Sequence, residues 1–419
     1  MNKTKKILPE LRFPEFKNDG EWIEKKLGLL SNITIGEFVI KTKQNPNSLY
    51  PVYNGGISYT GFYDEYNNEA NKIVISARGA NAGFVNLIKE KYWAGNSCYS
   101  VEILNENKTD LEFLFYYIKH NQRIFTDNQQ AANIPSISKS DVEKFQVYYP
   151  ENISEQQKIA ACLSSLDELI SAHSQKLELL KAHKKGLMQN LFPQEGKKVP
   201  NYRFPEFKDS GEWEEETLGK VYDFKSTNSL SREYLSYEKG IVKNIHYGDI
   251  HTTFNTLFDI TKEKVPFIKY CVPVKIKKDN YCIEGDIIFA DASEDIDDIG
   301  KSIEIINLNN EKLVSGLHTL LARQRKQKLA IGFGGYLFKS DWFRKQIQRE
   351  AQGAKVLGIS ATRISRIRIL FPQNIIEQQK IASCLSSLDE LITAQSKKIE
   401  QLKQHKKGLM QGLFPKLKN

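Results

Sequence analysis

Apolar residues between positions 151 and 193 recur at alternating steps of four and three, which is the period of a narrow coiled-coil seam and not of a strand. The seam positions are Ile159, Leu163, Leu166, Ile170, Leu177, Leu180 and Leu187. Between Ser154 and Asn190 only Gly186 disfavours a helix. The pattern therefore predicts one helical rod of roughly 50 Å, at about 1.5 Å per residue.

The same stretch returns 222 residues later, at 373–415, with only ten differences between the two copies. Its seam positions are Ile381, Leu385, Leu388, Ile392, Ile399, Leu402 and Leu409. An exposed seam of this length needs a partner, and the other copy is the nearest one. The lysines near the end of each copy, such as Lys184 and Lys406, suit helix C-termini, where cations complement the dipole. Direct contact with phosphate is the alternative for them.

A second repeat has a different offset. The segment Arg12–Trp22 (RFPEFKNDGEW) returns 191 residues later as Arg203–Trp213 (RFPEFKDSGEW), so the piece between the two repeats is 31 residues longer in the second half. Two constant frames thus hold dissimilar inserts, which suggests one task performed on two different targets. We expect Pro415–Leu417 to lie near the first frame, as Pro193 runs into the second.

These repeats predict six segments of the chain. They are a frame at 1–22, a globule at 23–150, a long helix at 151–193, a linker with the repeated frame at 194–213, a second globule at 214–372 and a second long helix at 373–419.

Both globules alternate short strands with turns and helices, which predicts an α+β (mixed α/β) fold class. The first should hold strands at 50–53 and 72–77, a hairpin-like pair at 92–101 and an amphipathic helix at 111–124. The second should hold strands at 285–290 and 317–322 and a helix at 336–351. A half-buried strand at 366–371, with a largely basic outer face, should close it.

The amino-acid composition predicts that the protein binds an acidic partner. The net charge is +9 and the pI is near 9, and nucleic acid is the commonest partner of a basic protein. The five cysteines are odd in number and form no CxxC pair, which predicts a reducing compartment and no zinc ribbon. No run approaches 18 apolar residues and the start has no apolar core, so we expect neither a membrane span nor a signal peptide.

Motifs of enzymes are incomplete in this chain. Gly300-Lys301-Ser302 resembles the end of a P-loop, but the pattern requires glycine at Asp295. The acidic group Asp286, Asp291, Glu294 and Asp295 reads as a solvated loop, and His246–His251 does not have a zinc spacing. The sequence therefore predicts no catalytic residues and no metal ligands.

Side chains that can read base edges remain, in turns of both globules. In the first globule the candidates are Asn54, Ser58, Tyr59, Arg78, Asn81, Asn96 and Ser97. In the second they are His246, Tyr247, His251, Thr252, Thr253 and Ser293, with Arg363 and Arg366 beside the closing strand. For any one of them, ordinary turn chemistry is the alternative.

The whole pattern resembles the DNA-specificity (S) subunit of Type I restriction–modification enzymes. The resemblance rests on the repeated frame, on the helix entry Ile-x-Glu-Gln-Gln-Lys-Ile-Ala at 153–160 and 375–382, and on the Leu-Phe-Pro exit, and it covers essentially the whole chain. It implies that each globule is a target recognition domain that reads one half of a bipartite, asymmetric double-stranded DNA site. It also implies an antiparallel helix pair that sets the spacing and docks two methyltransferase subunits.

The resemblance further implies that restriction subunits join the complex and that this subunit has no active site of its own. S-adenosylmethionine, ATP and Mg2+ would then belong to the partners, which act on adenine in the bacterial cytoplasm. With half-sites of about 3–5 bp on one face of the duplex, the unread gap should be about 5–7 bp. The alternatives are a free-standing DNA-binding regulator that dimerises through its helices, and an enzyme.

Overall fold

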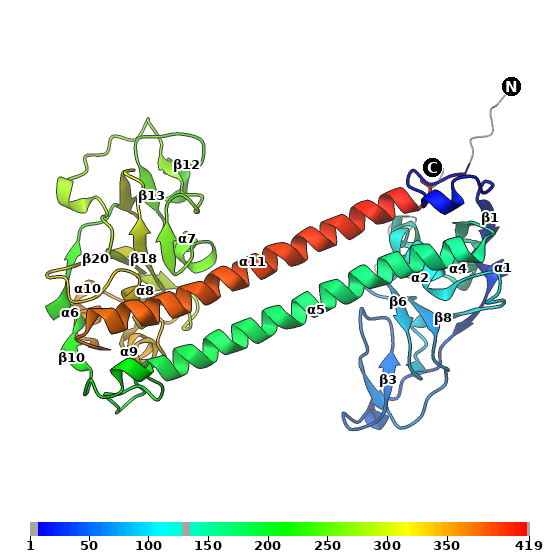
Figure 1. Cartoon of the computed structure of the whole chain (residues 1–419), viewed down its shortest axis with the longest axis horizontal. Coiled ribbons are helices and arrows are strands. Elements are labelled where there is room, and N and C mark those ends of the chain that lie inside the picture. The colour runs from blue at the N-terminus through cyan, green and yellow to red at the C-terminus, as the bar shows by residue number, and fades with distance from the viewer. Residues whose placement is uncertain (1–6, 128–134, 417–419) are drawn as a thin grey trace. The chain divides into compact units, whose positions relative to one another are not determined.

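Two helices of 39 residues each, α5 (Ile153–Leu191) and α11 (Ile375–Leu413), dominate the computed structural model, which describes residues 7–127 and 135–416 (Figure 1). The predicted rods are therefore confirmed, and Gly186 is helical. Each helix begins after an asparagine whose Oδ1 accepts a hydrogen bond from the first turn, at 3.0 Å for Asn152 and 2.9 Å for Asn374. At about 1.5 Å per residue, each rod is roughly 58 Å long.

The chain divides into two compact units, and each takes one half of both helices. Unit 1 is Met1–Gln175 with Ser396–Asn419, and unit 2 is Lys176–Gln395. In unit 1, Ile159 and Leu163 near the start of α5 share a core with Leu413 at the end of α11. In unit 2 the pairing is reversed, because Leu191 shares a core with Ile381 and Leu385.

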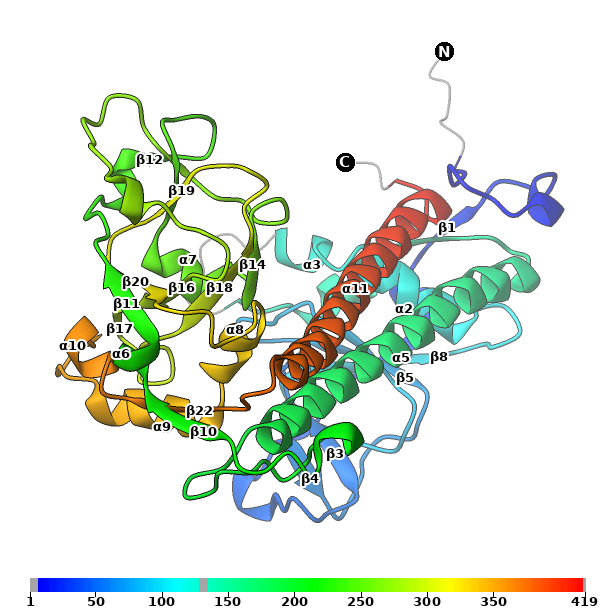
Figure 2. The same cartoon turned by 60° about the vertical axis from the view of Figure 1, so that its left-hand side comes forward.

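The helices therefore pack antiparallel within each unit, side by side as Figures 1 and 2 show. Every predicted seam position is buried or half-buried.

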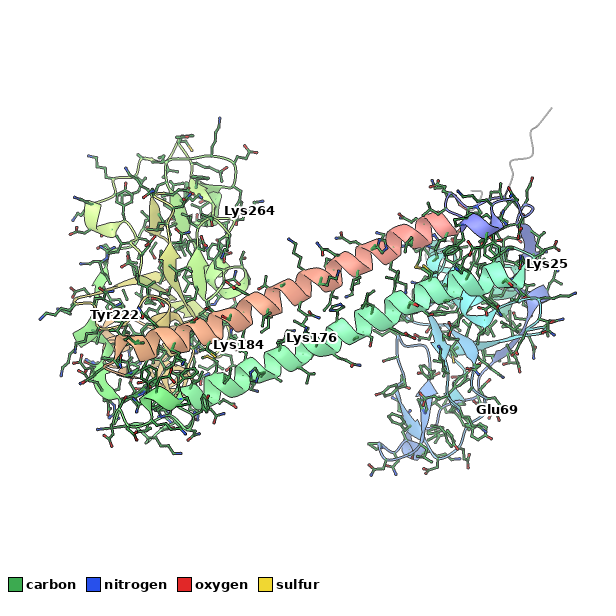
Figure 3. The ribbon with its side chains drawn as sticks, viewed as in Figure 1. Lys25, Glu69, Lys176, Lys184, Tyr222 and Lys264 are labelled. Atoms are coloured by element: carbon green, nitrogen blue, oxygen red, sulfur yellow. The ribbon has the colours of Figure 1, made fainter. Side chains whose placement is uncertain are left out.

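An ion pair between the helices repeats in the two units. Lys406 Nζ lies 2.5 Å from Asp167 Oδ2 in unit 1, and Lys184 pairs with Asp389 in unit 2 (Lys184 is labelled on α5 in Figure 3). Each lysine lies about two turns before its helix ends. Each of these two lysines therefore neutralises an aspartate on the facing helix.

The repeated frame is held to the long helices by a buried ion pair. In unit 1 the Arg12 guanidinium donates to both carboxylate oxygens of Glu155, at 2.8 and 2.7 Å, and Trp22 Nε1 donates to the same carboxylate. In unit 2, Arg203 donates to both oxygens of Glu377 at 2.7 Å. The repeated sequence thus encodes one bidentate clamp in each unit.

The next residue of each helix, a glutamine, holds the globule. Gln156 accepts from Asp110 N at 2.9 Å and donates to the carbonyls of Lys108 and Pro150. Gln378 accepts from Ala330 N at 2.7 Å and donates to the carbonyls of Lys328 and Pro372. Both side chains are fully buried, and each satisfies three backbone groups, two of which lie in loops that carry no sequence repeat.

The frames also join the helix ends in the same way. Leu11 N donates to Gly412 O at 2.8 Å, and Tyr202 N donates to Asn190 O at 2.9 Å. Lys416 pairs with Glu10, so the expectation that the last helix ends near the first frame is confirmed for residues up to 416. Leu417 lies outside the described residues.

The globular part of unit 1 contains two sheets. Their orders are β2-β8-β5-β6 and β4-β3-β7, and β1 pairs with β9. The strands are β1 (Ile23–Lys26), β2 (Ser31–Ile35), β3 (Tyr50–Tyr53), β4 (Gly61–Tyr63), β5 (Lys72–Ser76), β6 (Val85–Ile88), β7 (Trp93–Ala94), β8 (Cys98–Ile103) and β9 (Gln146–Tyr149). The helices are α1 (Leu27–Leu30), α2 (Leu111–His120), α3 (Ile124–Asp127) and α4 (Lys139–Lys144).

Two expectations for unit 1 were wrong in detail. The stretch 92–101 is no hairpin, because β7 pairs with β3 in one sheet and β8 pairs with β2 and β5 in the other. The helix expected at 111–124 ends at His120, where Asn121 Nδ2 donates to Tyr117 O and closes the last turn. Phe113 and Tyr117 are buried as well, so this helix is covered on more than one side.

The globular part of unit 2 is built on a five-stranded sheet, β11-β20-β16-β18-β14, and a four-stranded sheet, β12-β15-β13-β19 (Figure 2). The strands are β10 (Glu214–Thr217), β11 (Tyr222–Lys225), β12 (Leu235–Ser236), β13 (Lys243–Ile245), β14 (Leu257–Asp259), β15 (Phe267–Ile268), β16 (Ile287–Ala290), β17 (Ala292–Ser293), β18 (Ser302–Asn307), β19 (Leu313–Ser315), β20 (Thr319–Gln324), β21 (Leu357–Gly358) and β22 (Arg368–Phe371). The helices are α6 (Leu218–Val221), α7 (Tyr247–Thr252), α8 (Phe333–Leu337), α9 (Asp341–Glu350) and α10 (Ala361–Ile364).

Two expectations for unit 2 also need correction. The helix expected at 336–351 is broken, because Ser340 has extended backbone angles and separates α8 from α9. The closing strand, β22, has a less basic outer face than expected. Leu370 is buried, and Arg368 pairs with Glu215 across the β10–β22 ladder at 2.8 Å.

Candidate nucleic-acid interface

Three turns of unit 1 meet where its two sheets join. Asn54 Oδ1 accepts a hydrogen bond from Ser97 N at 3.1 Å, and Ser97 O accepts one from Ala77 N at 2.8 Å. On the other side, Ser76 Oγ donates to Gly56 O at 2.9 Å. These bonds bring four predicted candidates onto adjoining turns, namely Asn54, Arg78, Asn96 and Ser97.

Glycines allow this close approach. Gly55 has a φ of +82°, and a Cβ there would lie 3.1 Å from both Arg78 O and Ser97 Cβ. A Cβ on Gly95 would lie 2.3 Å from Asn54 Oδ1. Since no other residue fits either position without displacing a neighbour, the two glycines fix the arrangement of the three turns.

Several candidates of unit 1 present free donors or flat surfaces. Arg78 and Asn81 are exposed, and the Arg78 guanidinium makes no hydrogen bond or ion pair with another described residue. Tyr59 is 51% exposed and packs on Phe62 with a ring-centroid distance of 4.8 Å. Ser58 lies on the same turn. An unpaired guanidinium and an exposed aromatic ring are suited to base edges and base faces.

In unit 2, five candidates belong to one short helix, α7, or flank it. His246 precedes the helix and is 7% exposed, and its Nδ1 accepts from Gly248 N at 3.2 Å. Burial, and then the charge of Arg232, lowers the pKa of His246, so a neutral ring that can accept this bond is expected at neutral pH. Tyr247 packs on both His246 and His251, while Thr252 and Thr253 are exposed.

His318 also belongs to this group, although it was not among the predicted candidates. Its backbone is left-handed, with a φ of +53°, and its ring contacts Tyr247 at a centroid distance of 5.2 Å. Its Nδ1 lies 3.2 Å from Asp291 Oδ1, within hydrogen-bond distance. Burial raises the pKa of Asp291, and His318 opposes that rise.

The remaining candidates of unit 2 are separate from α7 or engaged elsewhere. Ser293 is 8% exposed, and its Oγ accepts from Asp295 N. Arg363 pairs with Glu350 at the end of α9. Arg366 is exposed, and its guanidinium has no hydrogen-bond or ion-pair partner among the described residues. No hydrogen bond between described residues links Arg363 or Arg366 to α7.

The acidic group of unit 2 was expected to form one solvated loop, but the structure does not show this. Asp286 is buried and forms a bidentate pair with Arg323, at 2.9 and 2.7 Å, while Asp291 faces His318. Lys301, in the P-loop-like tripeptide, pairs with Asp298. Within 7–127 and 135–416, no group of three or more histidine, cysteine or acidic side chains could hold a metal ion. No helix in these ranges is long and apolar enough to cross a membrane.

Comparison with protein families places both halves of the chain in one group. The family described as "Type I restriction modification DNA specificity domain" matches residues 19–182 and again residues 210–404. The MjaVIII specificity subunit of a Type I restriction enzyme from Methanocaldococcus jannaschii is 28% identical over 351 residues, or 81% of this chain and 77% of that protein.

A putative type I specificity subunit from Mycoplasma genitalium, S.MgeORF438P, is 25% identical over 227 residues, or 54% of this chain. The matched part spans 58% of the length of that relative. A solved structure is also similar, the crystal structure of a Type-I restriction-modification system S subunit from M. genitalium. It has a TM-score of 0.66 and 18% identity, and the match covers 98% of this chain and 100% of that one. At this identity the likeness establishes the fold.

Proposed function

Because the chain belongs to the Type I restriction modification DNA specificity family, we propose that it selects the DNA target of such an enzyme and has no active site of its own. The globules at 23–150 and 214–372 are the target recognition domains. Each reads one half of a bipartite, non-palindromic site in double-stranded DNA. The partner subunits carry S-adenosylmethionine, ATP and Mg2+ and perform adenine methylation or restriction.

One observation carries this proposal: two equivalent bidentate ion pairs hold the repeated frames, while the two globules carry different donor-rich surfaces. The Arg12–Glu155 and Arg203–Glu377 pairs have the same bidentate geometry. The surfaces differ, with Asn54, Arg78 and Ser97 on turns in unit 1 and Tyr247 with its neighbours on α7 in unit 2. A constant frame with different readers is what a DNA site with two unlike halves requires.

The proposal is tested by selection from a library of random duplexes with the complex of this chain and its methyltransferase subunits. We expect one motif with two unlike half-sites separated by about 5–7 unread base pairs. A palindromic motif, or no enrichment, would contradict the proposal. Methylation or cleavage by the purified chain alone, with S-adenosylmethionine, ATP and Mg2+, would contradict the assignment of catalysis to the partners.

Arg78 offers a residue-level test of unit 1. We expect Arg78→Ala to relax one position of one half-site, by about 1–3 kcal/mol of discrimination, because a bidentate contact to guanine is lost. Arg78→Lys should relax the same position, since lysine keeps the charge but not the paired donors. The other half-site should be unchanged in both variants. If Arg78→Lys selects the wild-type motif, Arg78 contacts the backbone and not a base.

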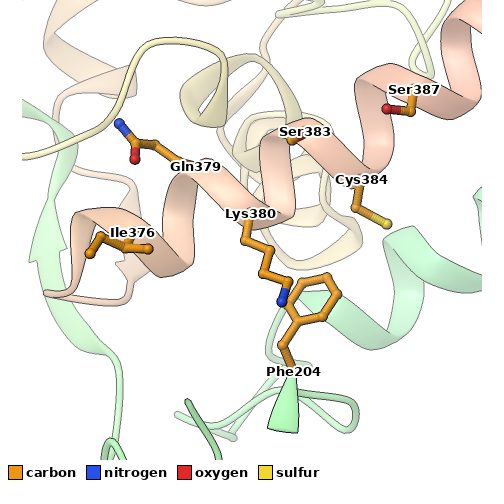
Figure 4. A pocket seen from close by; sticks show the side chains of 7 residues that line it. All are labelled: Phe204, Ile376, Gln379, Lys380, Ser383, Cys384 and Ser387. Carbon is orange, nitrogen blue, oxygen red and sulfur yellow. The ribbon is translucent and has the colours of Figure 1, made fainter. Parts of the chain in front are cut away.

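We assign methyltransferase docking to an exposed face of the long helices. Cys162, Ser165 and Leu169 of α5 recur as Cys384, Ser387 and Leu391 of α11, outside the seam. Leu169 is 42% and Leu391 is 54% exposed, although burial is the usual place for leucine. In α11 this face borders a groove lined by Phe204, Ile376, Gln379, Lys380, Ser383, Cys384 and Ser387 (Figure 4). Two equal faces in one chain favour two copies of one partner.

We expect Leu169→Glu with Leu391→Glu to weaken the binding of both methyltransferase subunits. Burial of each leucine contributes about 1.5–3 kcal/mol, or roughly 10- to 150-fold in Kd. Leu179→Glu is the matched control, because Leu179 is 71% exposed on α5 but has glutamine, Gln401, at the equivalent position of α11. The subunit ratio of the complex, measured by mass, checks this result. Equal assembly by the double variant and the control would exclude this face.

A further inference from the structure

The two dissimilar globules share a pair of residues, Tyr-x-x-Lys. It is Tyr116 with Lys119 in unit 1 and Tyr336 with Lys339 in unit 2. Each tyrosine hydroxyl donates at 2.8 Å to the helix aspartate that already binds a lysine, Asp167 or Asp389. The tyrosines therefore secure the globules to the helices. The lysines need a different explanation.

Neither Lys119 nor Lys339 has a carboxylate partner among the described residues. Lys119 Nζ donates to Val85 O at 2.6 Å, and Lys339 Nζ donates to Thr256 Oγ1 at 2.5 Å. Both side chains are half-buried. Burial is the main cause that lowers the pKa of each lysine to about 8, and the neighbouring Lys406 or Lys184 lowers it further. A partly desolvated ammonium beside a second cation is stabilised by an anion.

Lys339 lines a cavity that could hold such an anion. The cavity has a volume of about 290 Å³ and is lined by Lys181, Lys184, Lys185, Met188, Gln189, Tyr336, Lys339 and Asp341, so four lysines face one aspartate. Lys181 pairs with Glu178 and Lys184 with Asp389. Lys185 and Lys339 have no such partner in the described part of the chain. This volume is ample for a phosphate group.

The same lysines recur in unit 1. Lys403 and Lys407 occupy the positions of α11 that match Lys181 and Lys185 of α5, and both are exposed. Lys119 takes the place of Lys339, next to the equivalent Tyr116–Asp167–Lys406 group. The long helices are repeats, but the globules are not. Retention of the lysine in both globules therefore indicates a role that does not depend on which target each globule reads.

We propose that Lys339 with Lys185, and Lys119 with Lys407, form two equivalent sites that each bind one phosphate of the DNA backbone. This inference rests on the proposed function, because it takes duplex DNA as the ligand. A duplex presents equivalent phosphates twice, on its two strands, and so matches two equal sites in one chain. Lysine binds phosphate as a point charge and carries no base readout, so these contacts hold any sequence equally.

The test uses the assembled complex and measures DNA affinity against salt concentration. We expect Lys339→Gln or Lys119→Gln to reduce the magnitude of the slope of log K against log[salt] by about 0.9, and the double variant by about 1.8. The loss should be equal on target and random duplexes, with an unchanged motif. Lys339→Arg should retain the slope. Lys176→Gln is the matched control, an exposed lysine of α5 that does not line the cavity (labelled in Figure 3).

A second measurement identifies the phosphate. Neutral methylphosphonates placed one at a time along the duplex should weaken wild-type binding at one position where they leave Lys339→Gln unaffected. Lys185→Gln should behave like Lys339→Gln, and because Lys185 is exposed, this variant does not depend on the folding of the interior. An unchanged slope in both variants overturns the proposal.

The same variants distinguish a phosphate of the DNA backbone from free inorganic phosphate as the ligand. If inorganic phosphate shifts the Lys339 side-chain NMR signal of the wild type while the slopes stay unchanged, the cavity binds free anions, and the DNA assignment is wrong. Failure of the proposed function has a different signature, because the wild-type complex would then show no target preference. The salt dependence of binding to random duplexes would still show whether the lysines contact phosphate.

Discussion

Glu377→Ala is expected to destabilise unit 2 by about 3–5 kcal/mol, because it leaves the Arg203 guanidinium buried without its partner. Side chains of both residues are at most 7% exposed, and the pair has two hydrogen bonds of 2.7 Å. Hydrogen exchange should therefore show lost protection in residues 176–395. Glu155→Ala should have the corresponding effect in unit 1, where the carboxylate also binds Trp22.

The matched control is Glu390→Ala, since Glu390 is exposed on the same helix and should change stability by less than about 0.5 kcal/mol. Arg203→Met combined with Glu377→Leu should recover much of the loss, because an apolar pair of similar volume removes both buried charges. If Glu377→Ala unfolds at the same denaturant concentration as Glu390→Ala, the clamp does not hold the frame.

Insertion of seven residues into both long helices is expected to abolish modification of the wild-type motif and to create a new one. The inserts belong after Gln175 and after Gln395, where the two units divide, so that neither unit is altered. Seven residues add roughly 10 Å and keep the seam on the same side of each helix to within about 20°. The new motif should keep both half-sites and have a gap longer by about 3 bp.

Sequencing of methylated adenines in a host that expresses the variant complex measures the motif. Insertion into α5 alone is the control, because it misaligns the two seams and should destabilise the chain without yielding a new motif. Altered half-site bases with an unaltered gap would show that the helices do not set the spacing.

The helices could be predicted from the sequence because their signal is local. The four-and-three spacing of Ile159, Leu163 and Leu166 requires only the helical period. The Arg12–Glu155 clamp was visible only as two unexplained repeats, since its members lie 143 residues apart. Repetition marked both residues, but only the fold brings them together.

The breaks inside the globules were not predictable for the same reason. The stretch 92–101 has hairpin character, yet Gly95 N donates to Tyr53 O and takes β7 into the other sheet. The residues at 336–351 form two helices because Ser340 turns extended between α8 and α9. In the first case a contact distant in sequence decides against the local preference, and in the second Ser340 Oγ donates to Leu337 O and closes α8.

In the candidate interface, too, features with a local sequence signal could be predicted, and features that depend on distant contacts could not. Asn54, Arg78 and Ser97 were predicted from their turns, and hydrogen bonds between those turns bring them together. His318 was missed because what sets it apart is a left-handed backbone and an aspartate 27 residues away. A histidine in a turn carries no such information by itself.

The exchange of helix halves between the units has a consequence for synthesis on the ribosome. Domains usually fold in the order in which they emerge from the ribosome, which synthesises the chain at about 5–20 residues per second. Here Phe414 packs on Phe113 and Tyr117 in the core of unit 1, so that core lacks a wall until about 300 further residues have been made. Unit 2 needs nothing beyond Gln395. The half that is translated first is therefore completed last, and for roughly 15–60 seconds the nascent chain must keep an unfinished apolar surface from aggregating.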